Sequence, residues 1–153
     1  MFFKRSRWAV GVSIRFSQKP QILPLLQTLS IALCTYNGSK FLREQLQSLA
    51  NQTLLPFEVV ITDDCSTDDT LSIIKEFSNI LNIRVFVNDL PLKVTKNFEK
   101  AISLCSGDVI LMCDQDDIWH PDKLAKIDKY FRENPAQLAV YQDAKYHLGR
   151  TLG

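Results

Sequence analysis

The sequence lacks the features that mark several common protein classes. None of its four cysteines forms a C-x-x-C pair, and neither of its two histidines lies at a ligand-like spacing from a cysteine, so a zinc site is not expected. A disulfide framework is not expected at a length of 153 residues, which leaves reduced thiols in a cytosolic setting as the default interpretation. No apolar run approaches the ~20 residues that a membrane-spanning helix needs.

The chain also has little net charge, because 18 Lys and Arg residues face 17 Asp and Glu residues and leave a formal charge of +1. No global field therefore indicates nucleic acid or acidic lipid as a partner. Residues 1–28 nevertheless carry basic residues and no acid. Two interpretations of this segment stay open: a poorly ordered or mis-assigned start, and a weak contact with a membrane surface. The organised domain is predicted to begin near Leu29.

Short apolar runs alternate with helical patterns from Leu29 onward. Apolar runs predict strands at 29–34, 57–62, 83–87, 108–113 and 138–141. Between them, apolar spacing predicts amphipathic helices: one ending near Asn51, one capped by Ser66, one reaching Cys105, and one with Pro121 in its first turn. This alternation predicts an α/β fold with a mostly parallel sheet that helices cover on both faces.

Three polar clusters follow predicted strands directly, at Tyr36-Asn37, at Asp63-Asp64 and at 114–117. In open parallel sheets, ligands bind outside the carboxyl ends of the strands. The functional site is therefore expected where these clusters meet.

The third cluster carries the sharpest chemical signal. Asp114 and Asp116 are separated by one residue, so both carboxylates could bind one hard divalent cation such as Mg²⁺ or Mn²⁺. Without a cation, repulsion between these neighbouring carboxylates would raise the pKa of one of them. The alternative is a solvated acidic turn placed for the dipole of the next helix, and Asp117 and Asp122 fit that alternative better. Spacing alone does not decide between the two.

The second cluster supports two interpretations as well. Asp63 and Asp64 could accept hydrogen bonds from a base imide or a ribose hydroxyl, or they could satisfy backbone N–H groups in a turn. The flanking thiols of Cys65 and Cys113 are expected to be small core groups, because neighbouring carboxylates disfavour a thiolate. Trp119 is expected to pack beneath the acidic loop.

Two other acidic α/β folds fit poorly. A receiver domain would need a Thr and a Lys at later strand ends, and nothing clear follows the acidic cluster here. A haloacid-dehalogenase-like phosphatase would place its Asp-x-Asp motif directly after the first strand, whereas Asp114 lies late in this chain.

Five motifs occur in order along residues 29–153. They are Cys34-Thr35-Tyr36-Asn37-Gly38, Asp63-Asp64-Cys65-Ser66-Thr67-Asp68, Lys96-Asn97-Phe98-Glu99, Gly107-Asp108 and Asp114-Gln115-Asp116-Asp117-Ile118-Trp119. Together they resemble the family 2 glycosyltransferases of the GT-A fold. The last motif is most similar to the form in bacterial rhamnosyl- and glucosyltransferases of surface-polysaccharide assembly.

The resemblance implies that residues 29–153 form the nucleotide-sugar-binding half of a GT-A domain, an α/β/α sandwich with an incomplete, mostly parallel sheet. It assigns the nucleotide sugar to Cys34, Thr35, Tyr36, Asn37, Asp63, Asp64, Lys93, Asp114 and Gln115, and a Mn²⁺ or Mg²⁺ cofactor to Asp114 and Asp116. Within the metal pair, Asp116 is the better candidate for direct ligation.

The resemblance further implies transfer of a hexosyl group from a UDP- or dTDP-linked donor to a hydroxyl of a glycan or lipid-linked acceptor, with inversion. The expected location is the cytoplasm, at or near the inner face of the membrane. The cation would stabilise the departing diphosphate, and a carboxylate base would take the acceptor's proton.

The chain departs from the family pattern at three points. Cys65 and Lys93 stand where the family commonly has glycine, so two turns must form without it. No motif resembling the family's catalytic base occurs, and Asp143 is a poor candidate for that role. The expectation is therefore a donor half that is inactive alone.

Two rival hypotheses remain. A non-catalytic nucleotide-binding module of the same fold would explain the missing base. A nucleotidyltransferase also pairs acids with a nucleotide-binding sheet, but it would bring a Gly-rich basic loop after the first strand, where this chain has Thr35-Tyr36-Asn37-Gly38.

Overall fold

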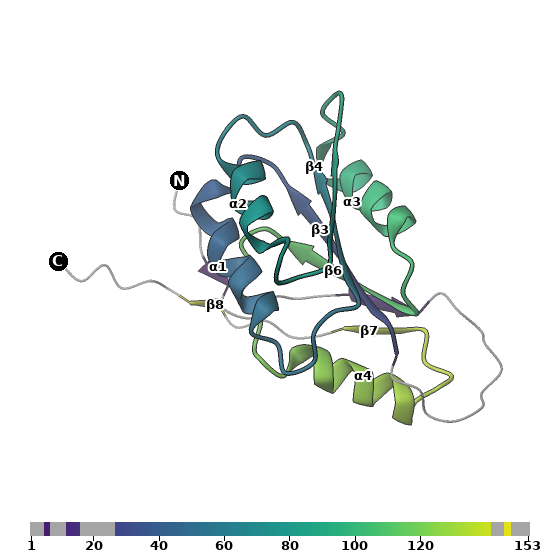
Figure 1. The fold of residues 1–153 in the computed structure, drawn as a ribbon. Helices are drawn as coiled ribbons and strands as arrows, with labels where there is room; N and C mark the ends of the chain where they lie inside the picture. Colours follow the sequence, from purple (N-terminus) through teal and green to yellow (C-terminus); the bar gives the residue numbers. More distant parts are fainter. Residues whose placement is uncertain (1–4, 7–11, 16–26, 142–145, 148–153) are drawn as a thin grey trace.

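The computed structural model describes residues 5–6, 12–15, 27–141 and 146–147. In chain order the elements are β1 (Arg5–Ser6), β2 (Val12–Arg15), β3 (Leu29–Thr35), α1 (Ser39–Ala50), β4 (Glu58–Asp63), α2 (Thr70–Phe77), β5 (Ile83–Val87), α3 (Lys93–Leu104), β6 (Val109–Asp114), α4 (Lys123–Glu133), β7 (Ala139–Tyr141) and β8 (Tyr146–His147). Figure 1 shows their arrangement.

A six-stranded sheet in the order β5-β4-β3-β6-β2-β7 forms the centre of the molecule. Strands β3, β4, β5 and β6 are parallel, and β2 runs antiparallel to both β6 and β7. Two antiparallel pairings in succession give β7 the same direction as β6. The predicted mostly parallel α/β sheet is therefore confirmed.

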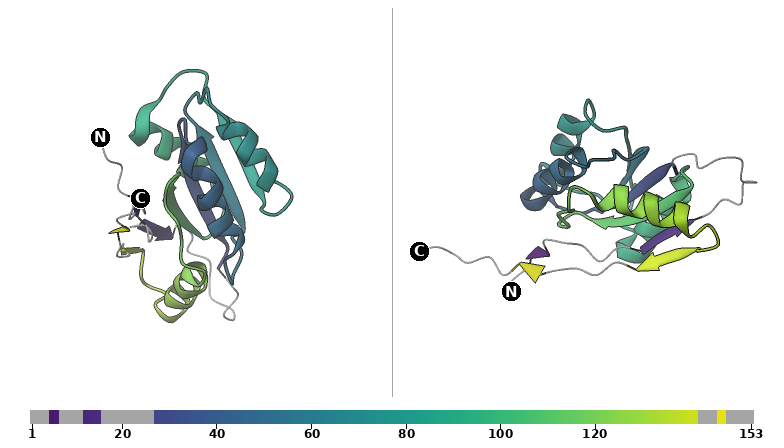
Figure 2. Two further views of the ribbon diagram at one scale, coloured as in Figure 1. Left: turned by 90° about the vertical axis from the view of Figure 1, so that its left-hand side faces the viewer. Right: turned by 90° about the horizontal axis from the view of Figure 1, so that it is seen from below.

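Helices cover both faces of the sheet, as the two turned views in Figure 2 show. Side chains of α1, α2 and α4 join one large core cluster with the odd-numbered residues of β3. On the opposite face, α3 packs Ala101 against the small Ala32 and against Ile110. Small side chains on that face let α3 lie close to the strands, because successive residues of a strand point to opposite sides.

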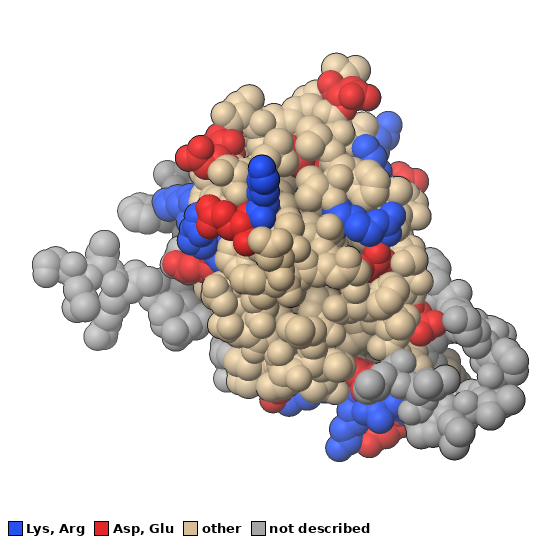
Figure 3. All heavy atoms as spheres, viewed as in Figure 1, with Lys and Arg blue, Asp and Glu red and all other residues tan. Residues whose placement is uncertain are grey.

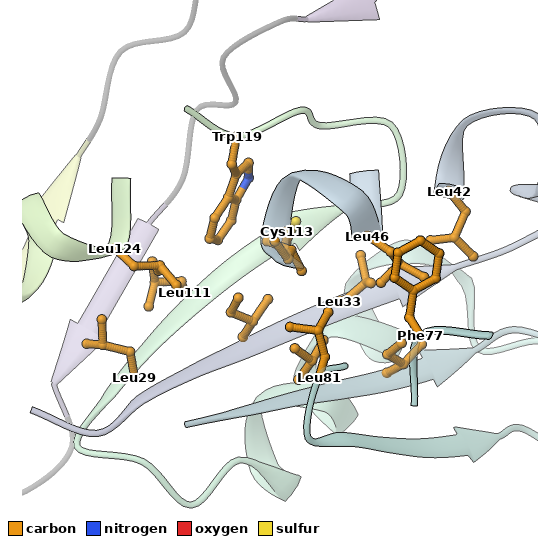
Figure 4. Close-up of a cluster of buried hydrophobic side chains, with 14 of the residues drawn as sticks. Leu29, Leu33, Leu42, Leu46, Phe77, Leu81, Leu111, Cys113, Trp119 and Leu124 are labelled. Carbon is orange, nitrogen blue, oxygen red and sulfur yellow. The ribbon is translucent and has the colours of Figure 1, made fainter. Parts of the chain in front are cut away.

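The larger core runs along the sheet beneath α1 and α4 (Figure 4). Leu33, Leu46 and Leu111 are almost completely buried there, and so are Leu124, Ile127 and Phe131 of α4. Burying one such side chain contributes roughly 1.5–3 kcal/mol.

Three predicted boundaries are wrong. The second helix begins at Thr70 rather than at Ser66, and its N-cap residue, Asp69, makes no side-chain capping bond. The third helix ends before Cys105, whose backbone is extended. The fourth begins at Lys123, so Pro121 precedes it and instead accepts a hydrogen bond from the backbone of Thr53 through its carbonyl.

The placement of the organised domain also needs correction. Strand β2 lies in the segment that was predicted to precede it, and Ser13 pairs with Leu111 on one side and with Val140 on the other. The pattern Val-Ser-Ile-Arg alternates apolar and polar residues, but four residues are too short a signal without the two partner strands.

On the face drawn in Figure 3, Lys and Arg side chains are interspersed with Asp and Glu side chains. This matches the near-zero net charge of the chain. Within the described residues, no helix has the length and apolarity that crossing a membrane requires.

Candidate functional site

The connections of the sheet change sides between β3 and β6. Helices α1 and α2 pack on one face, whereas α3, which leads into β6, packs on the other. Strands β3 and β6 are parallel neighbours, so their carboxyl ends lie side by side, with Cys34 paired to Asp114 (Figure 1). A crevice at such a switch point is where open α/β sheets bind ligands.

The end of β4 is tied to the end of β3. Asp63 is fully buried and accepts hydrogen bonds from the hydroxyls of Thr35 and Ser66 and from the backbone N–H of Ser66. Thr35 is buried as well. Both side chains, predicted to bind the nucleotide sugar, therefore bond to each other within the fold.

Asp64 organises the loop between β5 and α3. One carboxylate oxygen accepts from Asn88 at 2.8 Å and from the backbone of Leu92 at 2.7 Å, and the other accepts from the backbone of Lys93 at 2.9 Å. Burial would raise the pKa of Asp64, but these hydrogen bonds outweigh it and lower the pKa. Since a carboxylate oxygen has two acceptor positions, Oδ2 could accept one further hydrogen bond, although Asp64 is buried.

Three residues around the site adopt a left-handed backbone: Asn37 at φ 45°, Cys65 at φ 66° and Lys93 at φ 64°. Cys65 and Lys93 are the positions where the sequence departs from glycine in the resembling family. The turns therefore form with the left-handed conformation retained, which costs a non-glycine residue roughly 1–2 kcal/mol. Asp64 helps to hold Lys93 there through the Lys93 N–H.

The loop after β6 brings the acidic side chains of Asp114, Asp116 and Asp117 close together. Burial, followed by the charges of Asp117 and Asp116, raises the pKa of Asp114 to about 6. Asp114 as a whole is exposed, so solvent screening weakens this shift and its direction carries the argument. Asp117 is buried and closes the turn, because its backbone N–H donates a hydrogen bond to the Asp114 carbonyl at 3.3 Å.

Helix α1 and the residues directly after it hold this acidic loop by hydrogen bonds. The Ser48 hydroxyl accepts from the backbone of Trp119 at 3.0 Å, and Gln52 donates to the His120 carbonyl at 2.8 Å. Trp119 is buried, as predicted, and the ammonium of Lys123 lies 3.8 Å from its ring centroid. His120 contacts Asp122.

The remaining predicted residues divide by exposure. Tyr36 is 57% exposed, and its ring is free to meet a ligand. Cys34 is half-buried against Thr62, and burial raises the pKa of its thiol to about 12, which excludes a nucleophilic role. Lys93 is exposed, and Gln115 bonds to the backbone of Tyr36.

Residues to which the sequence interpretation gave no role hold these loops in place. Asn88 and Asn97 are buried and bond to each other, and Asn97 also donates to the Thr62 carbonyl at 2.9 Å. Asn88 follows β5, so a polar residue at a fourth strand end was the available signal. Ser48 on the buried side of α1 and Gln52, two residues after the end of α1, are both buried, and a buried polar side chain needs a hydrogen-bond partner.

The acidic loop fits a hard divalent cation in its chemistry. Its carboxylate oxygens suit Mg²⁺ or Mn²⁺, and mutual repulsion of the acids is what a cation would relieve. Among the described residues, no group of three or more His, Cys, Asp or Glu side chains is arranged to hold a metal alone. Ligand oxygens would therefore have to complete the coordination, as substrate phosphates do for Mg²⁺ in other sites.

A hollow of about 460 Å³ lies elsewhere, between α1 and α2, and is lined by Ser39, Lys40, Arg43, Asp69, Ser72, Ile73 and Glu76. None of the predicted site residues lines it. The ion pair between Arg43 and Glu76 crosses between the same two helices.

A family model for glycosyl transferase family 2 matches residues 30–151 of this sequence. The chain belongs to that family. The resemblance of its five motifs is thereby confirmed, and the nucleotidyltransferase alternative falls away.

Relatives of this chain that are named as glycosyl-transferring enzymes or as a synthase agree with the family assignment. It is 40% identical over 99 residues to a dTDP-rhamnosyl transferase, RfbG, of Shigella flexneri, covering 60% of this chain and 34% of the relative. It is 35% identical over 113 residues to a chondroitin synthase of Escherichia coli, covering 73% of this chain and 16% of the relative. The chain thus spans about a third or less of these relatives.

A solved structure shares the fold. The crystal structure of S. aureus TarS 1–349 in complex with UDP superposes with a TM-score of 0.66 at 34% identity, covering 69% of this chain and 32% of that one. The GT-A fold is therefore confirmed for this glycosyltransferase chain.

Asp143 and most of residues 1–28 lie outside the described residues.

Proposed function

We propose that this chain binds the nucleoside-diphosphate sugar of a family 2 glycosyltransferase and presents it for transfer to an acceptor hydroxyl. The observation that carries this proposal is the acidic loop at the switch point between β3 and β6. Asp114 there is paired in register with Cys34, and burial together with the neighbouring acids Asp117 and Asp116 raises the pKa of Asp114. The family assignment supplies the class of reaction.

Each residue has a role in this proposal. The exposed ring of Tyr36 and the backbone around Asn37 would line the base, and the acceptor position left on Asp64 Oδ2 would receive the base imide or a ribose hydroxyl. Lys93, exposed at the start of α3, would approach the diphosphate. Thr35 and Asp63 would act by holding the β3 and β4 ends together.

Asp116 and Asp114 would hold Mn²⁺ or Mg²⁺ together with the donor diphosphate. A divalent cation, when bound, would neutralise the charge that develops on the departing diphosphate. The two carboxylates would orient the diphosphate at the sheet end, and Trp119 below them keeps the loop in place by packing.

The finer predictions concern the donor and acceptor. We propose a UDP- or dTDP-linked donor, because TarS has been solved with UDP and with UDP-GlcNAc and RfbG is named a dTDP-rhamnosyl transferase. The acceptor would be a glycan or lipid-linked glycan in polysaccharide assembly, with inversion, on the cytoplasmic side of a membrane. Chondroitin synthase and TarS, by their names, also act in making or modifying polymers.

Calorimetric titration tests the proposal. UDP and dTDP are titrated into the chain with Mn²⁺, with Mg²⁺ and with a chelator, using wild type, Asp116→Ala and the control Glu133→Ala on α4. We expect metal to strengthen binding of one nucleotide in wild type and in the control, and Asp116→Ala to remove at least about tenfold of that gain. Equal affinity with and without metal would refute the metal assignment.

A turnover assay separates the enzyme from a non-catalytic module. The chain is incubated with the bound donor and Mn²⁺, and release of the nucleoside diphosphate is followed with and without candidate acceptor glycans. The assay is repeated with a candidate second polypeptide that carries a carboxylate base. Release in either case would identify an enzyme, whereas donor binding without release in both would favour the non-catalytic module.

A further inference from the structure

Gln115 stands between the two acids of the metal motif, yet its side chain turns away toward the neighbouring strand end. Its Oε1 accepts from the backbone N–H of Tyr36 at 2.9 Å, and its Nε2 donates to the carbonyl of the same Tyr36 at 3.1 Å. One side-chain amide thus binds both polar groups of one residue.

This pair of bonds extends the sheet beyond its backbone pairing. The β3–β6 register ends at Cys34 and Asp114. One residue later on β6 and two residues later on β3, the Gln115 amide takes the place of a further backbone rung. The acidic loop and the Tyr36 loop are therefore joined beyond the carboxyl ends of β3 and β6.

Gly38 makes room for this arrangement. A Cβ at Gly38 would lie 2.2 Å from Gln115 Oε1 and 2.7 Å from its Cδ. The backbone of Gly38, at φ −95° and ψ 6°, is open to any residue, so conformation does not require glycine there. Gly38 and Gln115 form a sterically matched pair, and the requirement for glycine comes from the Gln115 amide.

We infer that Gln115 is a positioning residue that couples cation binding at Asp114 and Asp116 to nucleotide binding at Tyr36. The inference rests on the proposed function. It reassigns Gln115 from a ligand contact to a link between two ligand-binding loops. Because the link joins the two loops, a ligand that orders one loop also orders the other, and the two binding events reinforce each other.

The coupling is measured as the factor by which Mn²⁺ strengthens UDP or dTDP binding. Direct contact between cation and diphosphate is the same in wild type and variant, so a change in the factor reports the protein link. In Gln115→Met, which keeps the length but loses both hydrogen bonds, we expect the factor to fall about tenfold. Affinity without Mn²⁺ should change far less. The matched control is Gln47→Met, an exposed glutamine on α1 that bonds only to Asn51.

Gly38→Ala tests the steric half of the pair. Its Cβ should displace the Gln115 amide and reproduce the loss of coupling. In a Gln115→Ala background the same substitution should cause no further loss, because the clashing atoms are gone. Should Gln115→Met fail to fold by circular dichroism, Gln115→Asn serves instead, since it keeps the amide but cannot span both Tyr36 groups.

The outcomes are distinguishable. If wild type binds neither nucleotide, the proposed function and the inference both fall. If wild type binds with Mn²⁺ reinforcement and the Gln115 variants retain the full factor, the inference alone is overturned. Additive losses from Gly38→Ala and Gln115→Ala would also overturn it.

Discussion

Two acidic clusters lie at strand ends on either side of β3, and their carboxyl groups are in opposite situations. At the end of β4, hydrogen-bond donors surround the carboxylates, and they hold the pKa of Asp64 below its usual value. At the end of β6, burial and neighbouring acids raise the pKa of Asp114 to about 6. The first cluster holds loops together through these hydrogen bonds, whereas in the second cluster the acids crowd one another.

The largest expected effect is on the first cluster. Asp63→Ala should lower the free energy of unfolding by about 3 kcal/mol, because the buried hydroxyl of Thr35 and the N–H of Ser66 lose their acceptor. Urea denaturation measures the loss. The counterpart Asp116→Ala should change stability by less than about 1 kcal/mol. Similar losses in both variants would erase the contrast between the clusters.

Asp64→Asn should lower the free energy of unfolding by about 2 kcal/mol near neutral pH. Both carboxylate oxygens accept from backbone N–H groups, so the amide N–H₂ of Asn would face at least one of these donors and leave it without an acceptor. The pKa of Asp64 is lowered on folding, so its stabilisation is present above the unfolded value near 3.8 and is lost as pH falls through the folded value. The difference between wild type and variant in urea midpoint should therefore shrink as the pH falls below 3.8. A pH-independent difference would contradict this.

Asp114→Asn should act in the opposite direction. Its pKa is raised on folding from 3.8 to about 6, so the protein loses stability as pH rises through that window. Removing the charge should stabilise the chain at neutral pH by about 1 kcal/mol after discounting for solvent screening, with no gain below about pH 3.8. Thermal melts across this range test the sign, and a loss at neutral pH would refute it.

The smallest effect concerns backbone strain near the first cluster. Lys93→Gly should stabilise the chain by about 0.5 kcal/mol, since relief of the left-handed backbone at φ 64° exceeds the entropy that glycine adds to the unfolded state. The control Lys96→Gly, inside α3, should instead cost about 1 kcal/mol. Melting temperatures that move the same way in both variants would argue against strain at Lys93.

Much of the fold was accessible from local patterns. Strand β5 was predicted with its observed bounds, and the apolar sides of α1 and α4 follow from helical spacing. The start of α2 was not, because Ser66, the predicted cap, instead donates its hydroxyl to Asp63 and accepts from the backbone N–H of Asn37 at 2.9 Å. A bond between residues so far apart in the chain has no periodic signal.

The candidate site shows the same limit. Sequence alone placed Asp63, Asp64, Asp114 and Asp116 at strand ends, because acidic residues that follow apolar runs are visible locally. It did not reveal that Thr35 donates a hydrogen bond to Asp63. Nor did it reveal that Asn88 and two backbone N–H groups donate hydrogen bonds to Asp64. Hydrogen-bond partners depend on which strands become neighbours.

By itself, the sequence determined the family, the alternation of strands and helices, and the positions of the acids that carry the proposed chemistry. Only the tertiary structure decided which acids are internally satisfied, where β2 inserts, and that Gln115 faces Tyr36 over Gly38. The physical reason is that apolar periodicity and residue type act over a few residues. Charge compensation and steric fit are set by groups that folding brings together from distant parts of the chain.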